Sequence, residues 1–474
     1  MRPQLPIWAL GALFFVLASI RHALHQSGAF DLACFDQPLY LLSQGLPPVS
    51  SVMGLHLLGD HAAWILWPLA LLYRAWADPH LLLLLQALTL ALGAWTAQLL
   101  GRQAGCTDRQ ATTLALAYAA HPLVFNANLF DFHPDAFVPV LLMGALYAAR
   151  AAKPGWCLVL CLAVAGCKEV MGLTVAGLGA YLVIFERRPW GAAVLALGLG
   201  SFAVDVAWVI PHFSGRAPGA IGRYAYLGGS VPEIARNLVL APWRWLPGLV
   251  SPERLVYLGY LFGPLAWGLR GRQLAPLVAA LPALALNLLA DYPAQHDVVH
   301  HYALPILPFL VAAAADCLAH QRTWVHSDRA IRIWAAVAFL ALAKPGYFAG
   351  PYLQHLDTLA AANEAIGRVP PGAALLTTHE LAPHLAHRVH LAFTDEGAPP
   401  ADLAAYDAVL LDLRHPGWRS SPAFAAALAD RLARDARFRE AYTSGPIRLF
   451  LSSRPGPLAC VEAMFPHDIA LPPP

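Results

Sequence analysis

Two carboxylates follow the first long apolar run of the chain, in the segment Phe30-Asp-Leu-Ala-Cys-Phe-Asp-Gln37. Asp31 and Asp36 therefore lie at a membrane surface, where either could take a proton from an acceptor hydroxyl as a general base. Because they are five residues apart, a helix would separate their directions by about 140°, so only one is expected to face a reaction site. The alternative reading is that Asp31 caps a short helix at the interface and Asp36 is solvated.

A second polar motif, Asp131-Phe-His-Pro-Asp135, stands between two apolar runs. Asp131, His133 and Asp135 together could bind a divalent cation, hold a phosphate-bound metal, or act as a base with a tuned pKa. Alternatively the motif is a turn at the interface in which an aspartate caps the next helix, with Pro134 at the helix start.

Two further clusters could hold a phosphate or a substrate. Lys168-Glu169 interrupts an apolar stretch, where charged residues are costly and tend to be functional, although the two could also neutralise each other. His301 and Tyr302 begin a later apolar run, where the alternative role is an aromatic belt at the headgroup level. His61, after Asp60, belongs to the same set of candidate substrate-binding residues.

Four histidines near the C-terminal end, His379, His384, His387 and His390, suggest a metal cluster at first sight. No carboxylate or thiol stands at a recognised ligand spacing beside them. We therefore expect a helix over 379–387 whose histidines form a solvated face.

The elements that position these residues are membrane helices. Of the 474 residues, 58% are hydrophobic and only 13% are charged, and the mean hydropathy is +0.52. Soluble domains carry about 25% charged residues, so we expect a polytopic integral membrane protein. A net charge of +2 without a basic stripe gives no reason to expect a nucleic-acid partner.

Apolar runs long enough to cross a bilayer, about 20 residues each, predict eleven spans if the longest run is split at Lys168-Glu169. The runs are 6–24, 79–100, 110–128, 135–151, 156–186, 190–211, 252–269, 274–290, 302–319 and 329–348. The segment 62–76, rich in Trp and interrupted by Pro68, is expected to lie in the interface instead.

Orientation follows from the basic loops. If 62–76 does not cross, all the short loops with paired basic residues fall on one side, which the positive-inside rule assigns to the cytoplasm. The outer side then carries all of Asp31, Asp36, His61, Asp131, His133, Asp135, Lys168, Glu169 and His301. The first run is expected to be a retained helix. The expected location is the inner (plasma) membrane, crossed many times.

After about residue 348 the composition changes to loops and short alternating stretches. Residues 369–378 are expected to form a turn and a strand, 405–413 a buried strand, and 421–437 an amphipathic helix. We expect 1–348 to form the transmembrane domain and 349–474 a small α/β domain on the outer side, with a disordered proline-rich end from Pro466.

With these motifs assembled, the sequence resembles the DUF2079 family of uncharacterised polytopic membrane proteins. The resemblance covers about residues 25–320. It rests on Phe30–Gln37 with Gly45, Gly59-Asp-His61 with Pro68, Leu82–Gln86, Asp131–Pro134, Lys168-Glu169 and His301-Tyr302. One position departs from the family pattern, because Val170 stands where Lys-Glu is usually followed by Asp.

The family in turn resembles the GT-C glycosyltransferase superfamily, which uses lipid-phosphate sugar donors. The expected fold class is thus an all-α, GT-C-like polytopic membrane protein, to which the pattern after residue 348 adds a small C-terminal α/β domain. The superfamily typically has an acidic residue in the first outer loop and often another acid in a later one. Asp31 or Asp36 and Asp131 or Asp135 occupy comparable places.

The resulting hypothesis is a membrane glycosyltransferase that moves a sugar from a polyprenyl-phosphate donor to an acceptor on the outer face. Asp31 or Asp36 would be the base, and Lys168 and His301 would hold the phosphate, with a cation on Asp131 and His133 as one option. Expected partners are the lipid-linked sugar and membrane lipids. The alternatives are a transporter or flippase and an inactive membrane scaffold, which the Val170 departure keeps open.

Overall fold

The computed structural model describes residues 6–453, which divide into two compact units. The first unit comprises residues up to 19, 55–69 and 80–348, and the second comprises 20–54, 70–79 and residues from 349 onward. The long loop after α1 (Ile7–Ala23) thus belongs largely to the same unit as the C-terminal region.

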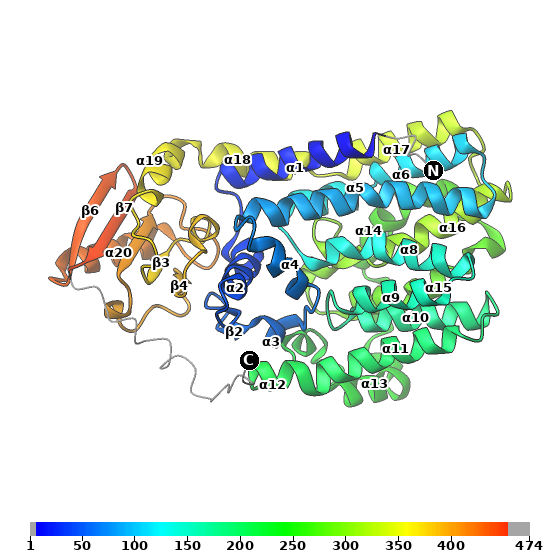
Figure 1. Cartoon of the computed structure of the whole chain (residues 1–474), viewed down its shortest axis with the longest axis horizontal. Coiled ribbons are helices and arrows are strands. Elements are labelled where there is room, and N and C mark those ends of the chain that lie inside the picture. Colours follow the sequence, from blue (N-terminus) through cyan, green and yellow to red (C-terminus); the bar gives the residue numbers. More distant parts are fainter. Residues whose placement is uncertain (1–5, 454–474) are drawn as a thin grey trace. The chain divides into compact units, whose positions relative to one another are not determined.

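The first unit is built of helices that run roughly parallel to one another (Figure 1). Its helices are α3 (Leu57–His61), α5 (Pro79–Ala104), α6 (Asp108–Ala119), α7 (Pro122–Leu129), α8 (Val138–Arg150), α9 (Pro154–Ala165), α10 (Met171–Ile184), α11 (Gly191–Val204), α12 (Ile210–Ser214), α13 (Val231–Leu240), α14 (Pro252–Phe262), α15 (Leu277–Leu289), α16 (Leu307–Ala319) and α17 (Asp328–Leu342). The chain passes between the units at five points. Four lie in helices, namely α1, α4 (Leu66–Tyr73), α18 (Pro345–Gln354) and the first residue of α5, and the fifth lies just before Leu55.

Helices α10 and α11 are held together by glycines. A Cβ atom on Gly179 would lie 2.3 Å from the backbone nitrogen of Leu195, and one on Gly198 would lie 2.4 Å from that of Ala176. Small residues let two helix backbones approach closely where apolar burial cannot drive association, as inside a bilayer. This contact fixes α10, and the turn that carries Lys168 and Glu169 directly precedes it.

Two helical stretches within 6–453 are long and apolar enough to cross a membrane, α5 and the continuous stretch Gly191–Ser214. Five shorter helices are strongly apolar. The expected span at 110–128 is divided into α6 and α7, because the chain turns at His121 and restarts at Pro122, the first residue of α7. The expected number of eleven spans therefore stays a prediction.

The segment expected to lie in the interface contains the eight-residue helix α4. At 1.5 Å per residue such a helix is about 12 Å long, far short of the roughly 30 Å needed to cross the hydrocarbon core.

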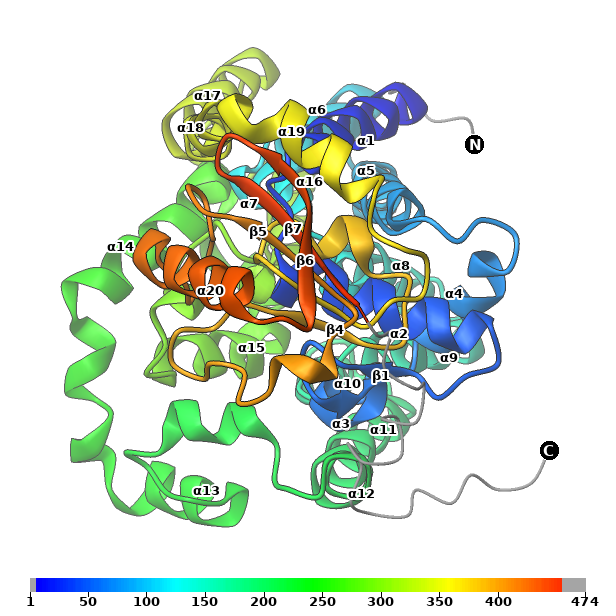
Figure 2. The same cartoon turned by 90° about the vertical axis from the view of Figure 1, so that its left-hand side faces the viewer.

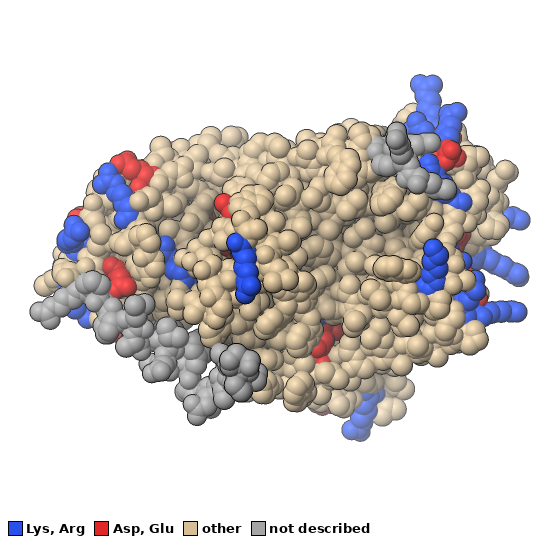
Figure 3. Space-filling model, viewed as in Figure 1, with Lys and Arg blue, Asp and Glu red and all other residues tan. Residues whose placement is uncertain are grey.

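Lysine and arginine side chains gather at one end of the first unit (Figure 3). This is the end at which α5 and α8 finish, each with an arginine in its last turn, Arg102 and Arg150. Because α9 leaves this end and α10 returns to it, the Lys168-Glu169 turn between them lies at the opposite end of the helices (Figure 1).

The second unit is a mixed sheet with helices. Its elements are α2 (Cys34–Ser43), α19 (Leu356–Ile366), α20 (Pro422–Arg434), β3 (Leu375–Thr377), β4 (Leu391–Phe393), β5 (Ala408–Asp412), β6 (Phe438–Ser444) and β7 (Ile447–Ser452). The strand order is β4-β3-β5-β7-β6. The pairs β4–β3 and β3–β5 are parallel, and β5–β7 and β7–β6 are antiparallel.

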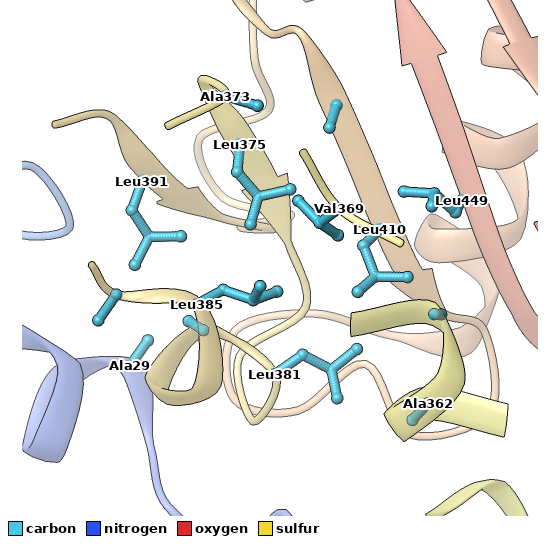
Figure 4. Close-up of a cluster of buried hydrophobic side chains, with 14 of the residues drawn as sticks. Ala29, Ala362, Val369, Ala373, Leu375, Leu381, Leu385, Leu391, Leu410 and Leu449 are labelled. Atoms are coloured by element: carbon cyan, nitrogen blue, oxygen red, sulfur yellow. The ribbon is translucent and has the colours of Figure 1, made fainter. Parts of the chain in front are cut away.

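Alternating side chains cover the two faces of this sheet. On one face Leu375, Leu410 and Leu449 pack with Ala362 of α19 and with Ala29 from the first loop (Figure 4). On the other face, Leu376, Val409, Leu411 and Phe450 pack with Leu428 and Leu432 of α20, and Figure 2 shows this unit from the side of β6. The first loop is thus part of the core that supports the sheet.

The sequence located β3, β5 and α20 within a few residues. The helix expected over 379–387 was wrong, because only a 3₁₀ turn forms there, Ala382–Leu385, with Pro383 near its start. Leu381 and Leu385 are drawn into the core under the sheet. The expectation of disorder from Pro466 lies outside the described residues.

Candidate functional site

Polar residues from five segments of the first unit meet around Tyr302. We call this group the Tyr302 cluster: His61, His133, Asp135, Lys168, Glu169, Arg223, His301 and Tyr302. His133, Asp135, Lys168, Glu169 and His301 are all buried. Buried charged groups are rare without partners, so the contacts of each member are informative.

Glu169 is paired with His61. The Oε2 atom of Glu169 lies 3.3 Å from Nδ1 of His61, and the backbone N–H of Glu169 donates to the carbonyl of His61 at 3.1 Å. The other ring nitrogen of His61 lies 3.3 Å from the Asp60 carboxylate. Glu169 thus connects the α9–α10 turn to α3. Its partner is His61, so Lys168 and Glu169 do not form a simple pair with each other.

Tyr302 lies against two cations. The ammonium of Lys168 is 5.3 Å from the centre of its ring and the guanidinium of Arg223 is 5.2 Å from it, both within cation–π range. Arg223 also donates to Gln295 Oε1 at 2.9 Å and to the Tyr302 hydroxyl at 3.4 Å. Burial disfavours the charged form of Lys168, but nearby negative groups, including the carboxylates of Asp135 and Glu169, outweigh burial and raise its pKa. The result is two fixed positive charges around one aromatic ring.

His133 and His301 are stacked, with ring centres 3.8 Å apart. Burial lowers the pKa of His133 to about 3, and burial and nearby positive groups, including Lys168, lower the pKa of His301 well below its usual value. Both rings are therefore neutral at pH 7. His301 is 5% exposed, and within residues 6–453 neither of its ring nitrogens has a hydrogen-bond partner.

The expected metal site does not fit this geometry. Nδ1 of His133 faces the backbone carbonyl of Asp131 at 3.2 Å, its ring is stacked on His301, and Asp135 lies 3.9 Å from Nε2 of His301. Among the described residues no group of three or more His, Cys, Asp or Glu side chains is arranged to hold a metal ion.

Buried amides fix the loops that carry the cluster. Gln86 of α5 donates to the carbonyls of Ala127 and Asn128 and accepts from the backbone N–H of His133. Asn287 of α15 donates to the carbonyl of Tyr302 at 3.2 Å and to the hydroxyl of Tyr257 at 2.8 Å. Such buried amides, satisfied on several sides, hold irregular backbone in one arrangement.

Asp36 lies in the second unit and is completely buried. Its Oδ1 atom accepts hydrogen bonds from the Tyr73 hydroxyl at 2.7 Å and from Nε2 of His387 at 3.1 Å. The His387 ring stacks on Tyr40 with centres 4.4 Å apart. The reading of Asp36 as a solvated carboxylate is therefore wrong: this carboxylate is enclosed and joins the first loop to the C-terminal region. Its expected catalytic role stays a prediction.

The pKa of His387 reflects this pairing. Burial disfavours its charged form, but the hydrogen bond to Asp36 and the negative charge of that carboxylate outweigh burial and raise the pKa. The His387–Asp36 pair is thus an ion pair when the imidazole is protonated.

Asp31 is partly exposed and lies on a short π-helix, Ala29–Ala33, in the second unit. Its Oδ2 atom comes within 2.9 Å of the point where a Cβ on Gly28 would stand, and the ring of His379 borders the same point. Of the two first-loop carboxylates, Asp31 is the more exposed.

Arg223 was missed by the sequence reasoning. It lies on the 3₁₀ turn Gly219–Tyr224 in the long loop between α12 and α14, which also contains Arg216, Arg236 and Arg244. The only sequence signal is the neighbouring Tyr224, whose hydroxyl donates to the carbonyl of Leu286 at 3.1 Å. Nothing in the spacing distinguishes this arginine from the other three.

Comparisons with known proteins agree with this fold. The sequence matches the family described as "Predicted membrane protein (DUF2079)" over residues 21–445. The fold is similar to that of ArnT from Cupriavidus metallidurans bound to undecaprenyl phosphate, with a TM-score of 0.54 and 16% identity over 95% of this chain and 98% of that one. It is also similar to ArnT in the apo state, with a TM-score of 0.52 and 15% identity over 94% and 97% of the two chains. No protein of curated function matches.

Proposed function

This chain belongs to the DUF2079 family of predicted membrane proteins, and on that premise we propose that it is a glycosyltransferase. The protein is an integral membrane protein with a fold like that of ArnT, a GT-C glycosyltransferase. The proposed donor is a sugar on a polyprenyl phosphate, and the proposed reaction takes place on the outer face of the inner membrane.

The Tyr302 cluster carries this proposal. Lys168 and Arg223 present positive charge at one aromatic ring, and buried His301 has two ring nitrogens without a partner in the described structure. Leaving a buried polar group unpaired costs about 1–3 kcal/mol, so a ligand group that hydrogen-bonds His301 would be favoured. A phosphate offers negative charge for the cations and oxygen acceptors for an imidazole N–H.

The chemistry then requires a base. In an inverting transfer the acceptor oxygen attacks the anomeric carbon, a carboxylate takes the hydroxyl proton, and the bond between that carbon and the phosphate oxygen breaks. The electron pair of that bond leaves with the phosphate, whose growing charge Lys168 and Arg223 would stabilise. Asp31 is our preferred base because it is partly exposed, whereas Asp36 is enclosed.

The proposed topology has a cytoplasmic N-terminus, eleven spans, and the basic end of the first unit in the cytoplasm. The region from residue 349 onward would then be on the outer side. Reporter fusions after residues 78, 105 and 360 test this arrangement. A cytoplasmic signal at residue 360 would contradict it.

The activity is tested by purifying the full chain into lipid nanodiscs and supplying polyprenyl-phosphate-linked radiolabelled sugars together with membrane extracts as a source of acceptor. Transfer by the wild-type protein, lost in Lys168→Ala and in Asp31→Asn but kept in Lys153→Ala, is the expected result. Lys153 is a matched control because it is an exposed lysine at the basic end.

A transporter or flippase is the main rival, and the same preparations separate it from an enzyme. In proteoliposomes a flippase would move a fluorescent polyprenyl phosphate between leaflets without breaking the sugar–phosphate bond. Lipid movement that depends on Lys168 without any transfer would replace the enzyme proposal.

A further inference from the structure

A second group of side chains in the second unit lies outside the phosphate chemistry. It consists of three aromatic residues, two acids and a histidine, which we call the Trp418 cluster: Phe30, Asp31, His379, Glu380, Phe393 and Trp418. The residues come from the first loop, the segment after β3, strand β4 and the loop after β5.

The aromatic rings form a platform. Phe393 and Trp418 are nearly parallel at 15°, with centres 6.4 Å apart, and the edge of Phe30 meets both, at 5.3 Å from Phe393 and 5.1 Å from Trp418. Trp418 is nevertheless 53% exposed. A large indole held in position with an open face is a surface for a flat, partly apolar ligand.

The backbone around Trp418 is arranged to hold it there. Gly417 has φ +81° and Arg419 has φ +61°, the left-handed region that costs energy for a residue with a side chain. The absent side chain of Gly417 leaves space that Glu380 fills, since a Cβ there would lie 2.1 Å from Glu380 Oε2. Arg419 pairs with Asp395 at 3.1 Å and lies against the Trp418 ring, so its charge is already compensated.

Beside the platform, His379 and Glu380 have buried polar atoms with unused hydrogen-bonding capacity, although Nδ1 of His379 lies 3.8 Å from Oε1 of Glu380. His379 is 8% exposed and its ring lies 5.9 Å from Trp418, yet its Nδ1 atom and Oε2 of Glu380 have no hydrogen-bond partner within residues 6–453. The Asp31 carboxylate and the His379 ring border the same point at Gly28. Carboxylates only accept hydrogen bonds when ionised, so these groups suit a ligand rich in hydroxyl donors.

We infer that the Trp418 cluster is a saccharide-binding subsite that receives the acceptor, an inference that rests on the proposed transfer of a sugar. The C–H face of a pyranose would pack on Trp418, while its hydroxyls would donate to Asp31 and Glu380. The two carboxylates repel a phosphate, which distinguishes this subsite from the Tyr302 cluster. A hydroxyl held at Asp31 is also placed beside the proposed base.

The test is saturation-transfer NMR on the full chain in nanodiscs, with the methyl β-glycosides of glucose, galactose and mannose and with N-acetylglucosamine at millimolar concentration. At least one probe should receive saturation at its ring C–H protons. Trp418→Ala should weaken that binding by about tenfold, and Trp418→Phe should keep most of it. Trp76→Ala, a change of another exposed tryptophan in the same unit, should leave binding intact.

Binding of undecaprenyl phosphate is measured on the same samples and should be unchanged in Trp418→Ala. Absence of saturation with all four probes, or equal saturation in the wild type and Trp418→Ala, would overturn the inference. If transfer occurs without saccharide binding, the proposed function stands and this inference fails. If Trp418-dependent saccharide binding occurs without transfer, the inference survives as a binding site and the proposed function fails.

Discussion

The Tyr302 cluster and the Trp418 cluster differ in the charge of the groups beside their aromatic rings and in how deeply those groups are buried. In the first unit the acids serve partners within the protein, Glu169 with His61 and Asp135 with Lys168, and cations face Tyr302. In the second unit Asp31 is partly exposed and Trp418 is open. The difference indicates that one region suits an anion held by preset charges, and the other suits a neutral polyol and a proton acceptor.

The largest effect is expected from the proton acceptor. Asp31→Asn keeps the shape of the side chain but removes the base, so transfer should fall by about 10²–10⁴-fold while undecaprenyl phosphate still binds. The measurement is initial-rate transfer alongside donor binding. Asp36→Asn is the comparison: because Asp36 is buried against Tyr73 and His387, its loss should lower the melting temperature. Wild-type transfer in both variants would remove the first loop from the catalytic centre.

The effect of removing Lys168 should be somewhat smaller than that of Asp31→Asn, and it should extend to donor binding. Lys168→Ala should lower kcat/KM by about 10²–10³-fold and also weaken donor binding, because the cation already attracts the phosphate in the ground state. Lys168→Arg should recover part of the binding. An unchanged KM for the donor would mean that Lys168 supports the fold and not the phosphate.

Arg223 should contribute less, because its guanidinium is shared with Gln295, Tyr292 and Tyr302. Arg223→Ala should raise the donor KM by about tenfold, the size of one charged hydrogen bond. Arg244→Ala, an exposed arginine in the same loop, should have no effect. Equal effects of the two substitutions would show that only the net charge of the loop matters.

The smallest effect is a pH dependence of stability in the second unit. The folded pKa of His387 is raised, so protonation stabilises the fold fully below the unfolded value of about 6.5. This contribution disappears as pH rises through the raised folded pKa. The melting-temperature advantage of the wild type over His387→Gln should therefore shrink as pH rises above about 6.5.

His390 provides a control of opposite sign in the same segment. Burial lowers its pKa, so the folded state resists protonation and is destabilised as pH falls below the unfolded value. The melting temperature of His390→Gln should therefore rise relative to that of the wild type as the pH is lowered. Parallel pH curves for the two variants would contradict the assigned partner of His387.

The sequence predicted the parts of the fold whose residue patterns are strong. The buried runs at β3 and β5 and the capped amphipathic helix α20 were found from local pattern alone. Strands β6 and β7 were not, because their outward positions are polar and half-exposed. The division of 110–128 was missed because hydropathy continues across the turn at His121, which is set by Pro122.

Among the candidate residues, the rarity of charged residues within apolar sequence was informative. The sequence did not indicate which partners each side chain contacts. Charges such as Lys168 stand out within apolar sequence, and the structure places Lys168, Glu169, His61, His133, His301 and Tyr302 in one cluster. The burial of Asp36 depends on His387, 351 residues further along the chain, which no local pattern records. Arg223 likewise is distinguished only by its tertiary contacts with Tyr302.

The central claim, that the Tyr302 cluster holds a lipid-linked phosphate, is tested most directly by titrating undecaprenyl phosphate into the full chain in nanodiscs. The wild type, Asp31→Asn and Lys153→Ala should bind it with equal affinity. The double variant Lys168→Ala/Arg223→Ala should bind at least about 100-fold more weakly, which corresponds to two lost charged contacts. Equal binding by the double variant and the wild type, with both folded, would contradict the account.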